Sequence, residues 1–255
     1  DLTKTITPTP GNKKLMEEIL PSIETVEKLF FAGGEPLLQV EHYILLERLI
    51  ELGKTDVVLS YATNFSNLKY LKWNVLDLWA HFKTVNVSAS LDGISQQCEY
   101  LRKGISWEKV EQNIEEVRKM PDRINFALIT TVSVHNIFHL FTFLENMLID
   151  KKIQGRDIEL SILSEPNYYS IQVLPQKEKI KITHHLSAFM KKHADKQDDY
   201  DWQQVFLNLN SVIDYMNSND QEHLFKNFIS MTKRLDFIRS ESFPTLFPEF
   251  HEYWD

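Results

Sequence analysis

The sequence predicts an α/β fold in which parallel strands alternate with helices. Five apolar runs of strand length end near residues 32, 63, 91, 131 and 165, and segments with helical periodicity separate them. These intervals, about 28 to 40 residues, suit repeated β-α-β units. Polar residues follow each run. Five strands joined by helices imply a parallel sheet with right-handed crossovers, in which functional groups gather at the carboxyl ends of the strands.

Each expected strand is an apolar or β-branched run bounded by glycine, proline or polar residues. In chain order the expected strands cover residues 26–32, 56–62, 84–91, 124–132 and 158–163. Gly33 and Gly93 follow the first and third strands. Pro166 closes the last strand, because proline has no N–H to donate to a sheet.

The helices are expected where apolar residues recur every three or four positions. In chain order they cover residues 12–20, 37–52, 68–82, 107–120, 138–148, 178–194, 202–216 and 220–239. Pro21 ends the first helix and Pro36 suits the first turn of the second, while Gly53 and Gly155 suit helix C-caps. Threonine and proline in residues 1–10 predict an extended lead-in.

The character of the sequence changes after Pro166, where helical patterns become dominant. We therefore expect a partial β/α core over residues 1–175 and a helical C-terminal extension, or cap, over residues 176–255. The aromatic and proline-broken tail at 243–250 is expected to run extended over the surface or along a groove.

Composition narrows the class of protein. The 255 residues are 43% hydrophobic and carry a net charge of −8, without an extended basic stripe, which argues against nucleic acid or an anionic membrane as partner. A single cysteine, Cys98, excludes an intrachain disulfide framework and fits a reducing compartment. No apolar run reaches the roughly 20 residues of a membrane span, and the polar start does not resemble a signal peptide. A cytoplasmic protein is expected.

The turn after the first strand is the strongest candidate site. Gly33 and Gly34 permit positive φ and a close approach of a ligand to the backbone, and Pro36 fits the helix that follows. Glu35 would hold its carboxylate at the strand end, where it suits a small cationic group such as an amine. An ordinary βα turn, with the glutamate favoured by the helix dipole, is the alternative interpretation.

Other familiar chemistry is not supported by motifs. The sequence has neither G-x-x-x-x-G-K-S/T nor G-x-G-x-x-G for phosphates, and no G-x-S-x-G for a serine nucleophile. Nothing in sequence beside Cys98 would lower its pKa. The pairs His135 with His139 and His184 with His185 could ligate a metal, but without a cysteine or carboxylate pattern we expect histidines of the surface or core.

Several segments, in order, resemble radical S-adenosylmethionine (radical SAM) enzymes. The segment 31–38 resembles the GGEP motif, Thr63-Asn64 the TN of the next strand, and Ser90-Leu91-Asp92-Gly93 the SLDG of the following one. The segment 102–110 resembles the R-x-G…F-x-K-V stretch of the branch with SPASM or twitch segments. Asn136 resembles an asparagine after the fifth strand, and Pro166-Asn167-Tyr168 with Leu174-Pro175 is similar to the P-x-Y…L-P of twitch-containing members. The resemblance covers about residues 24–175.

This resemblance implies a partial (β/α)6 barrel, N-terminally incomplete, with S-adenosylmethionine across the strand ends. Glu35 and its glycines would hold the methionine amino group, Thr63 or Asn64 and Ser90 would reach the ribose or carboxylate, and Arg102 would pair with the carboxylate. The residues so implied in cofactor binding are Gly33, Gly34, Glu35, Pro36, Thr63, Asn64, Ser90, Asp92 and Arg102. The alternatives are a plain turn at Asp92, a helix cap at Asn64 and a surface ion pair at Arg102.

The chain departs from the family at the iron-sulfur cluster. Family members ligate a 4Fe-4S cluster through a C-x-x-x-C-x-x-C loop after the first strand, and this sequence contains neither that loop nor that strand. Either the chain begins after the cluster loop, or the protein is a degenerate relative. The first interpretation is favoured, because motifs on the cofactor side are retained.

The resemblance therefore implies a radical SAM enzyme of the twitch or SPASM-like branch, catalytically incomplete as this chain stands. Its complete form would cleave the cofactor reductively to a 5′-deoxyadenosyl radical that abstracts hydrogen from a peptide or small-molecule substrate, with an electron donor such as flavodoxin or ferredoxin. The alternative is a non-catalytic barrel whose aromatic tail and helical cap hold a peptide or protein. An ordinary TIM-barrel enzyme is disfavoured, since only Asp92 and Glu165 are available as acids at other strand ends.

Overall fold

The computed structural model describes residues 19–254 except residues 24, 121 and 152. The lead-in expected at 1–10 and nearly all of the helix expected at 12–20 lie outside the described residues. The chain divides into two compact units: the first runs to Ala89 and includes Lys109–Phe126, and the second comprises Ser90–Glu108 and Ala127–Asp255. The division at residue 175 into core and extension stays a prediction.

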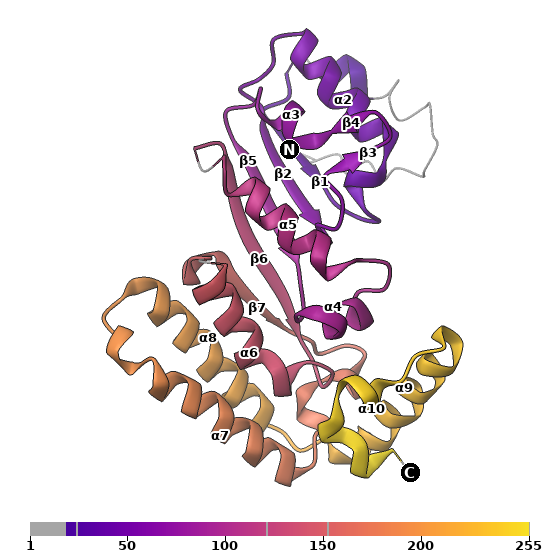
Figure 1. The fold of residues 1–255 in the computed structure, drawn as a ribbon, viewed down its shortest axis with the longest axis vertical. Helices are drawn as coiled ribbons and strands as arrows, with labels where there is room; N and C mark the ends of the chain where they lie inside the picture. Colours follow the sequence, from indigo (N-terminus) through magenta and orange to yellow (C-terminus); the bar gives the residue numbers. More distant parts are fainter. Residues whose placement is uncertain (1–18, 24, 121, 152, 255) are drawn as a thin grey trace. The chain divides into compact units, whose positions relative to one another are not determined.

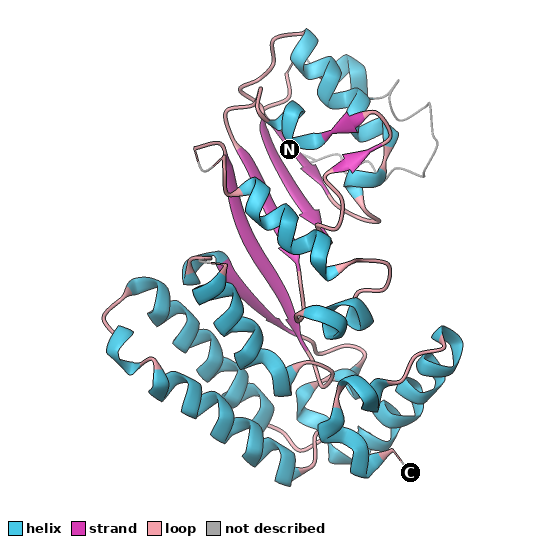
Figure 2. Ribbon diagram, viewed as in Figure 1, coloured by secondary structure: helices cyan, strands magenta, loops and turns pink. Residues whose placement is uncertain are grey.

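The main sheet has five strands in the order β1-β2-β5-β6-β7. Their bounds are β1 Lys28–Phe31, β2 Val58–Thr63, β5 Val85–Ser90, β6 Ile124–Val132 and β7 Ile158–Ile162. The pairs β1–β2, β2–β5 and β6–β7 are parallel, and Figure 2 shows the strands joined by helices. The five strands predicted from the sequence are therefore confirmed.

The first unit is built around β1, β2 and most of β5. Its helices are α2 (Val40–Glu51), α3 (Val75–Trp79) and the greater part of α5 (Trp107–Val117). The apolar side of α2 buries Tyr43 and Leu46, and Tyr61 of β2 packs against Trp79 with ring centroids 5.0 Å apart. This core holds the carboxyl ends of β1 and β2 in fixed register, with Phe31 opposite Tyr61.

The prediction of a helix at 68–82 is wrong for the first half of that range. Residues there form a two-stranded antiparallel sheet of β3 (Lys69–Tyr70) and β4 (Trp73–Asn74), before the short α3. Trp73 stacks on Tyr43 of α2 and donates from Nε1 to Glu47 at 2.7 Å, while Leu71 turns the chain at a positive φ of 51°. Contacts with α2 thus override the helical periodicity.

The second unit is mostly helical. Its helices are α4 (Ser95–Leu101), α6 (Leu140–Glu145) with a π-helical continuation at Asn146–Asp150, α7 (Gln176–Lys192), α8 (Tyr200–Asn217), α9 (Phe225–Arg239) and α10 (Phe243–Leu246). Figure 1 shows α7 and α8 side by side, and α8 also packs on β7. The helices expected after residue 175 are confirmed, with α9 beginning later than predicted. The helix α4 was not predicted, because Ile94 precedes it without a side-chain cap.

The tail does not run extended as expected. It forms α10 and a 3-10 segment at Pro248–Tyr253, and Phe243, Phe247 and Phe250 are fully buried. Their helical spacing places these rings together, with Phe243 and Phe247 stacked at 4.4 Å and Phe228 of α9 among them. The tail is part of the core of the second unit. Among the described residues, no helix has the length and apolar character to cross a membrane.

Candidate functional site

The predicted glycine turn follows β1 directly. Gly33 and Gly34 have φ of +80° and +56°, in the left-handed region where a side chain is strained. Pro36 begins a 3-10 turn at Pro36–Leu38, and Glu35 caps that turn by accepting the N–H of Leu37 at 3.3 Å. The turn therefore fixes the backbone that carries the Glu35 carboxylate.

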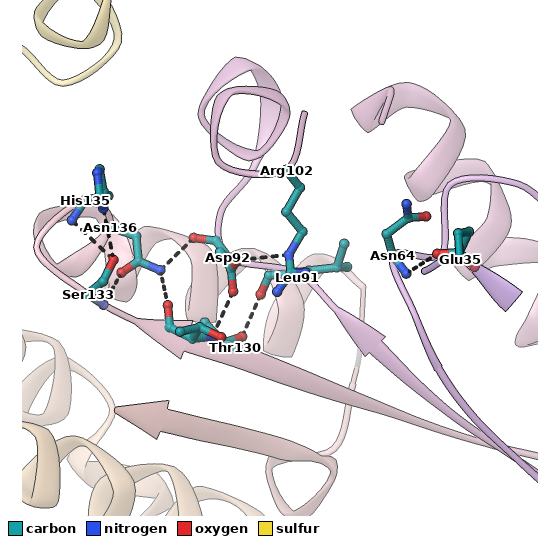
Figure 3. A network of polar contacts seen from close by, with 10 residues as sticks. Glu35, Asn64, Leu91, Asp92, Arg102, Thr130, Ser133, His135 and Asn136 are labelled. Atoms are coloured by element: carbon teal, nitrogen blue, oxygen red, sulfur yellow. Dashed lines mark hydrogen bonds and ion pairs between the residues drawn. The ribbon is translucent and has the colours of Figure 1, made fainter. Parts of the chain in front are cut away.

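Two residues at the end of β2 orient this carboxylate. The N–H of Asn64 donates to Glu35 Oε2 at 2.8 Å, and the hydroxyl of Thr63 donates to Oε1 at 2.5 Å. Figure 3 shows the contact between Glu35 and Asn64. We call Glu35, Thr63 and Asn64 the Glu35 cluster. A carboxylate offers about four lone-pair positions, so a donor beyond the three in place can still be accepted.

The side chain of Asn64 serves the local turn. Its Oδ1 accepts the N–H of Ser66 at 2.9 Å, as a cap does. Thr63 Oγ1 accepts the N–H of Phe65 at 3.0 Å while it donates to Glu35. Thr63 and the backbone of Asn64 therefore position Glu35, and direct contact of either residue with a cofactor stays a prediction.

A second cluster lies in the second unit, in the loop after β5 and at the end of β6. Asp92 Oδ1 accepts the N–H of Thr131 at 2.8 Å. Asn136 donates from Nδ2 to the carbonyls of Asp92 at 3.0 Å and Thr131 at 2.8 Å, and its Oδ1 accepts the N–H of Ser133 at 2.8 Å. We call Asp92, Arg102, Thr131, Ser133 and Asn136 the Asp92 cluster. Figure 3 shows Asp92, Arg102, Ser133 and Asn136 of this cluster.

Arg102 pairs with Asp92 in this cluster. Its Nε lies 2.8 Å from Asp92 Oδ2, and the side chains are 25% and 13% exposed. The Nε–H is not aligned for a hydrogen bond, so the contact is an ion pair rather than a directed bond. The structure thus shows Arg102 in an ion pair, one of the alternatives left open by its sequence. Ser90 ends β5 half-buried, and the roles of Ser90 and Arg102 toward a cofactor stay predictions.

Within the described residues, the groups that might ligate a metal do not form a cluster of three or more. Burial raises the pKa of the Cys98 thiol to about 12, so this single cysteine is a thiol at neutral pH. His139 Nε2 lies 2.9 Å from Glu249 Oε1. In the part of the chain that the structure describes, no group of three or more His, Cys, Asp or Glu side chains could hold a metal ion. The residues described do not fit an iron-sulfur cluster.

Sequence reasoning missed a cavity beside the Asp92 cluster. It has a volume of about 170 Å³, and the residues that line it include His135, Tyr169 and Arg239. These three come from separate segments, and Arg239 lies at the end of α9. No motif joins them, so only the fold could reveal the cavity.

The parallel sheet and the Glu35 cluster define a class of protein. A parallel β/α sheet that ends β1 in a glycine-flanked carboxylate, oriented from β2, is typical of α/β barrels that bind a small ligand at the carboxyl ends of their strands. The profile of the radical SAM superfamily matches residues 12–147, just over half of the chain. The chain belongs to the radical SAM superfamily, whose cofactors are S-adenosylmethionine and a 4Fe-4S cluster.

A curated relative is consistent with membership of this family. The chain is 28% identical over 149 residues to an S-adenosylmethionine-dependent nucleotide dehydratase of Fibrobacter sp. (strain UWH6), covering 52% of this chain and 41% of that protein. The chain thus spans about two fifths of the length of this curated relative.

Solved structures support the fold. Native anSMEcpe with bound AdoMet superposes with a TM-score of 0.51 at 18% identity, over 74% of this chain and 55% of that one. Streptococcus suis SuiB bound to S-adenosylmethionine gives a TM-score of 0.48 at 14% identity, over 75% and 41%. On the match to anSMEcpe and the family profile, the five-stranded parallel sheet is a partial radical SAM-type barrel.

Proposed function

We propose that this chain is the S-adenosylmethionine-binding part of a radical SAM enzyme that acts on a peptide or small-molecule substrate. The observation that carries the proposal is the Glu35 cluster. A carboxylate that three donors hold in place, with lone-pair capacity left, is ready for the ammonium group of methionine. The nucleotide dehydratase relative supports a small-molecule substrate.

The glycine turn contributes the second part of an ammonium site. Without Cβ atoms at Gly33 and Gly34, a ligand can reach the backbone carbonyls, and a Cβ at Gly33 would meet no atom within 4 Å. Open space beside Gly33 leaves room for the ligand, whereas the side chain of Gln39 lies next to Gly34. Glu35 would supply the charge, and the carbonyls would share the remaining N–H donors.

We assign the Asp92 cluster to the rest of the cofactor. Ser90 and Asp92 would accept the ribose hydroxyls. Arg102 keeps guanidinium N–H groups beyond the Nε that faces Asp92, and these can bind the methionine carboxylate. Asp92 then acts both as a ligand group and as the residue that orients Arg102.

S-adenosylmethionine supplies, in this superfamily, the 5′-deoxyadenosyl group from which a radical is formed. The residues of the Glu35 cluster, with Ser90, Asp92 and Arg102, would bind and orient that molecule. An electron donor such as flavodoxin or ferredoxin, membership of the twitch or SPASM-like branch and a cytoplasmic location remain part of the proposal.

Titration calorimetry of the full chain with S-adenosylmethionine tests the proposal. We expect saturable binding that Glu35→Gln weakens about tenfold or more, because a charge-assisted hydrogen bond contributes about 1.5–3 kcal/mol. Glu41→Gln, the same change in the first turn of α2, is the matched control and should leave binding unchanged. No binding to the wild-type chain, or equal binding to both variants, would overturn the proposal.

A further inference from the structure

The cavity beside the Asp92 cluster lies in the second unit and is lined by both polar and apolar side chains. Its volume is about 170 Å³. The side chains that carry its chemistry are Asp92, Ser133, His135, Asn136, Tyr169 and Arg239. Figure 3 shows His135 and Ser133 next to Asn136. Hydrogen bonds within the Asp92 cluster already occupy the side chains of Asp92 and Asn136. The groups left to meet a ligand are those of Ser133, His135, Tyr169 and Arg239.

Arg239 brings positive charge to this space. Its Nη1 donates to the carbonyl of Tyr100 at 3.2 Å and lies 3.9 Å from Glu241 Oε2. One bond and one distant carboxylate leave most of the five N–H donors of a guanidinium uncommitted by these contacts. The charge of Arg239 also lowers the pKa of His135 and opposes the rise in that of Tyr169, so it acts on both neighbours.

His135 lines the cavity as a neutral hydrogen-bonding group. Burial, and then the charge of Arg239, lower its pKa to about 4, so the imidazole is neutral at pH 7. Its Nδ1 lies 3.4 Å from Ser133 Oγ, and the rings of Tyr169 and Phe228 pack on it at 4.7 and 5.2 Å. A ring fixed in this way can offer an N–H in one direction.

The one anionic side chain that lines the cavity is already compensated. Asp92 faces the guanidinium of Arg102 and accepts the N–H of Thr131. The charge of Asp92 is therefore matched by Arg102. Arg239 is the cation that lines the cavity, and its own carboxylate neighbour, Glu241, is shared with Lys103. The volume is small compared with the roughly 300–1,000 Å³ of sites for drug-sized ligands, so it suits one functional group and not a whole nucleotide.

We propose that this cavity binds a carboxylate group of the substrate, with Arg239 as the cationic partner and His135, Tyr169 and Ser133 as neutral hydrogen-bonding groups. The assignment to the substrate rests on the proposed function, whereas the affinity for a carboxylate does not. The cavity would thus hold one end of the substrate, in addition to the residues that bind the cofactor.

The probes are acetate and acetamide, which have similar shape and differ in charge. The full chain is labelled with ¹⁵N, and the ring signal of His135 among the nine histidines is identified by its loss in His135→Asn. We expect acetate at millimolar concentration to shift this signal saturably, and acetamide at the same concentration to leave it in place. No shift with acetate, or equal shifts with both probes, would overturn the proposal.

Two variants locate the binding group. Arg239→Gln should weaken acetate binding at least tenfold, and Tyr169→Phe should weaken it several-fold. Arg234→Gln is the matched control, because Arg234 lies exposed on the same helix. Should Arg239→Gln fold poorly, Tyr169→Phe, which removes only a hydroxyl, still decides the question. Unchanged affinity in Tyr169→Phe and Arg239→Gln would contradict the assignment.

A final comparison identifies the source of the carboxylate. N-acetylglycinate presents a peptide terminus, the α-amide of N-acetylglutamate presents a peptide side chain, and acetate presents a free acid; the tightest of the three indicates the source. Displacement of acetate by S-adenosylmethionine would overturn the assignment to the substrate, because the carboxylate would then belong to the cofactor. Binding of S-adenosylmethionine without acetate binding refutes only this inference, and the reverse result refutes only the proposed function.

Discussion

The backbone N–H of Asn64, at the end of β2, donates to the carboxylate of Glu35, at the end of β1, over 2.8 Å. The two residues are distant in sequence but follow neighbouring parallel strands. A backbone donor cannot turn away as a side chain can, so the register of β1 on β2 sets the orientation of the carboxylate. The turn and the sheet therefore act together to form the Glu35 cluster.

Thr63 should be the side chain on which this orientation depends most. Thr63→Val keeps the shape but removes the hydroxyl donor to Glu35 Oε1, which then keeps only the N–H of Leu37, and it leaves the N–H of Phe65 without its acceptor. We expect the free energy of unfolding to fall by about 1–2 kcal/mol, measured by urea denaturation. Thr245→Val, at an exposed position of α10, is the control with little expected effect. Equal stability of Thr63→Val and wild type would show that the contact contributes nothing.

Two buried histidines should make the protein less stable in acid. Burial lowers the pKa of His42 to about 3 and that of His135 to about 4, whereas both are near 6.5 in an unfolded chain. Between these values the unfolded state binds more protons, so the free energy of unfolding must fall as pH decreases from about 6.5 toward 4. Each histidine contributes a slope of about 1.4 kcal/mol per pH unit within its window.

Substitution of one histidine shows how much it contributes to the slope of unfolding free energy against pH. His42→Gln removes one titrating group and should flatten the dependence of unfolding free energy on pH below 6.5, even if it lowers stability overall through loss of the 2.9 Å contact with the Tyr61 hydroxyl. Denaturant titrations at a series of pH values measure this. A variant with the wild-type slope would mean that His42 takes up its proton in the folded state.

The tail should contribute to the stability of the second unit. Phe250 is fully buried against Phe228 and Phe243, so Phe250→Ala should cost about 3–5 kcal/mol. Phe237 lies on α9 with 87% of its surface exposed, and Phe237→Ala should change stability by less than about 0.5 kcal/mol. Thermal unfolding of both variants makes the comparison. Similar melting temperatures would place the tail outside the core.

The sequence predicted the five strands because each is an apolar run with a clear stop, as at Gly33 after β1. It predicted the Glu35 turn for the same reason, since two glycines and a proline have few other local uses. The predicted secondary structure was wrong where the sequence carries no strong local signal, as at residues 68–74 and in the C-terminal tail. The β3–β4 pair depends on Trp73 stacking on Tyr43, and the tail depends on three phenylalanines that find their partners only in the folded unit.

The polar contacts were predicted less completely than the elements. The candidate residues Glu35, Thr63 and Asn64 come together because adjacent parallel strands deliver them. The pairing of Arg102 with Asp92 depends on the unpredicted α4, which lies between them in sequence. The cavity with His135, Tyr169 and Arg239 needs three segments to pack first, and no single stretch of sequence carries that information.

A crystal structure of this chain soaked or grown with S-adenosylmethionine tests the central claim most directly. The account predicts that the methionine amino nitrogen lies within about 3.2 Å of a carboxylate oxygen of Glu35, beside the backbone of Gly33 and Gly34. A cofactor bound elsewhere, with Glu35 keeping only the N–H groups of Leu37 and Asn64 and the hydroxyl of Thr63, would contradict it.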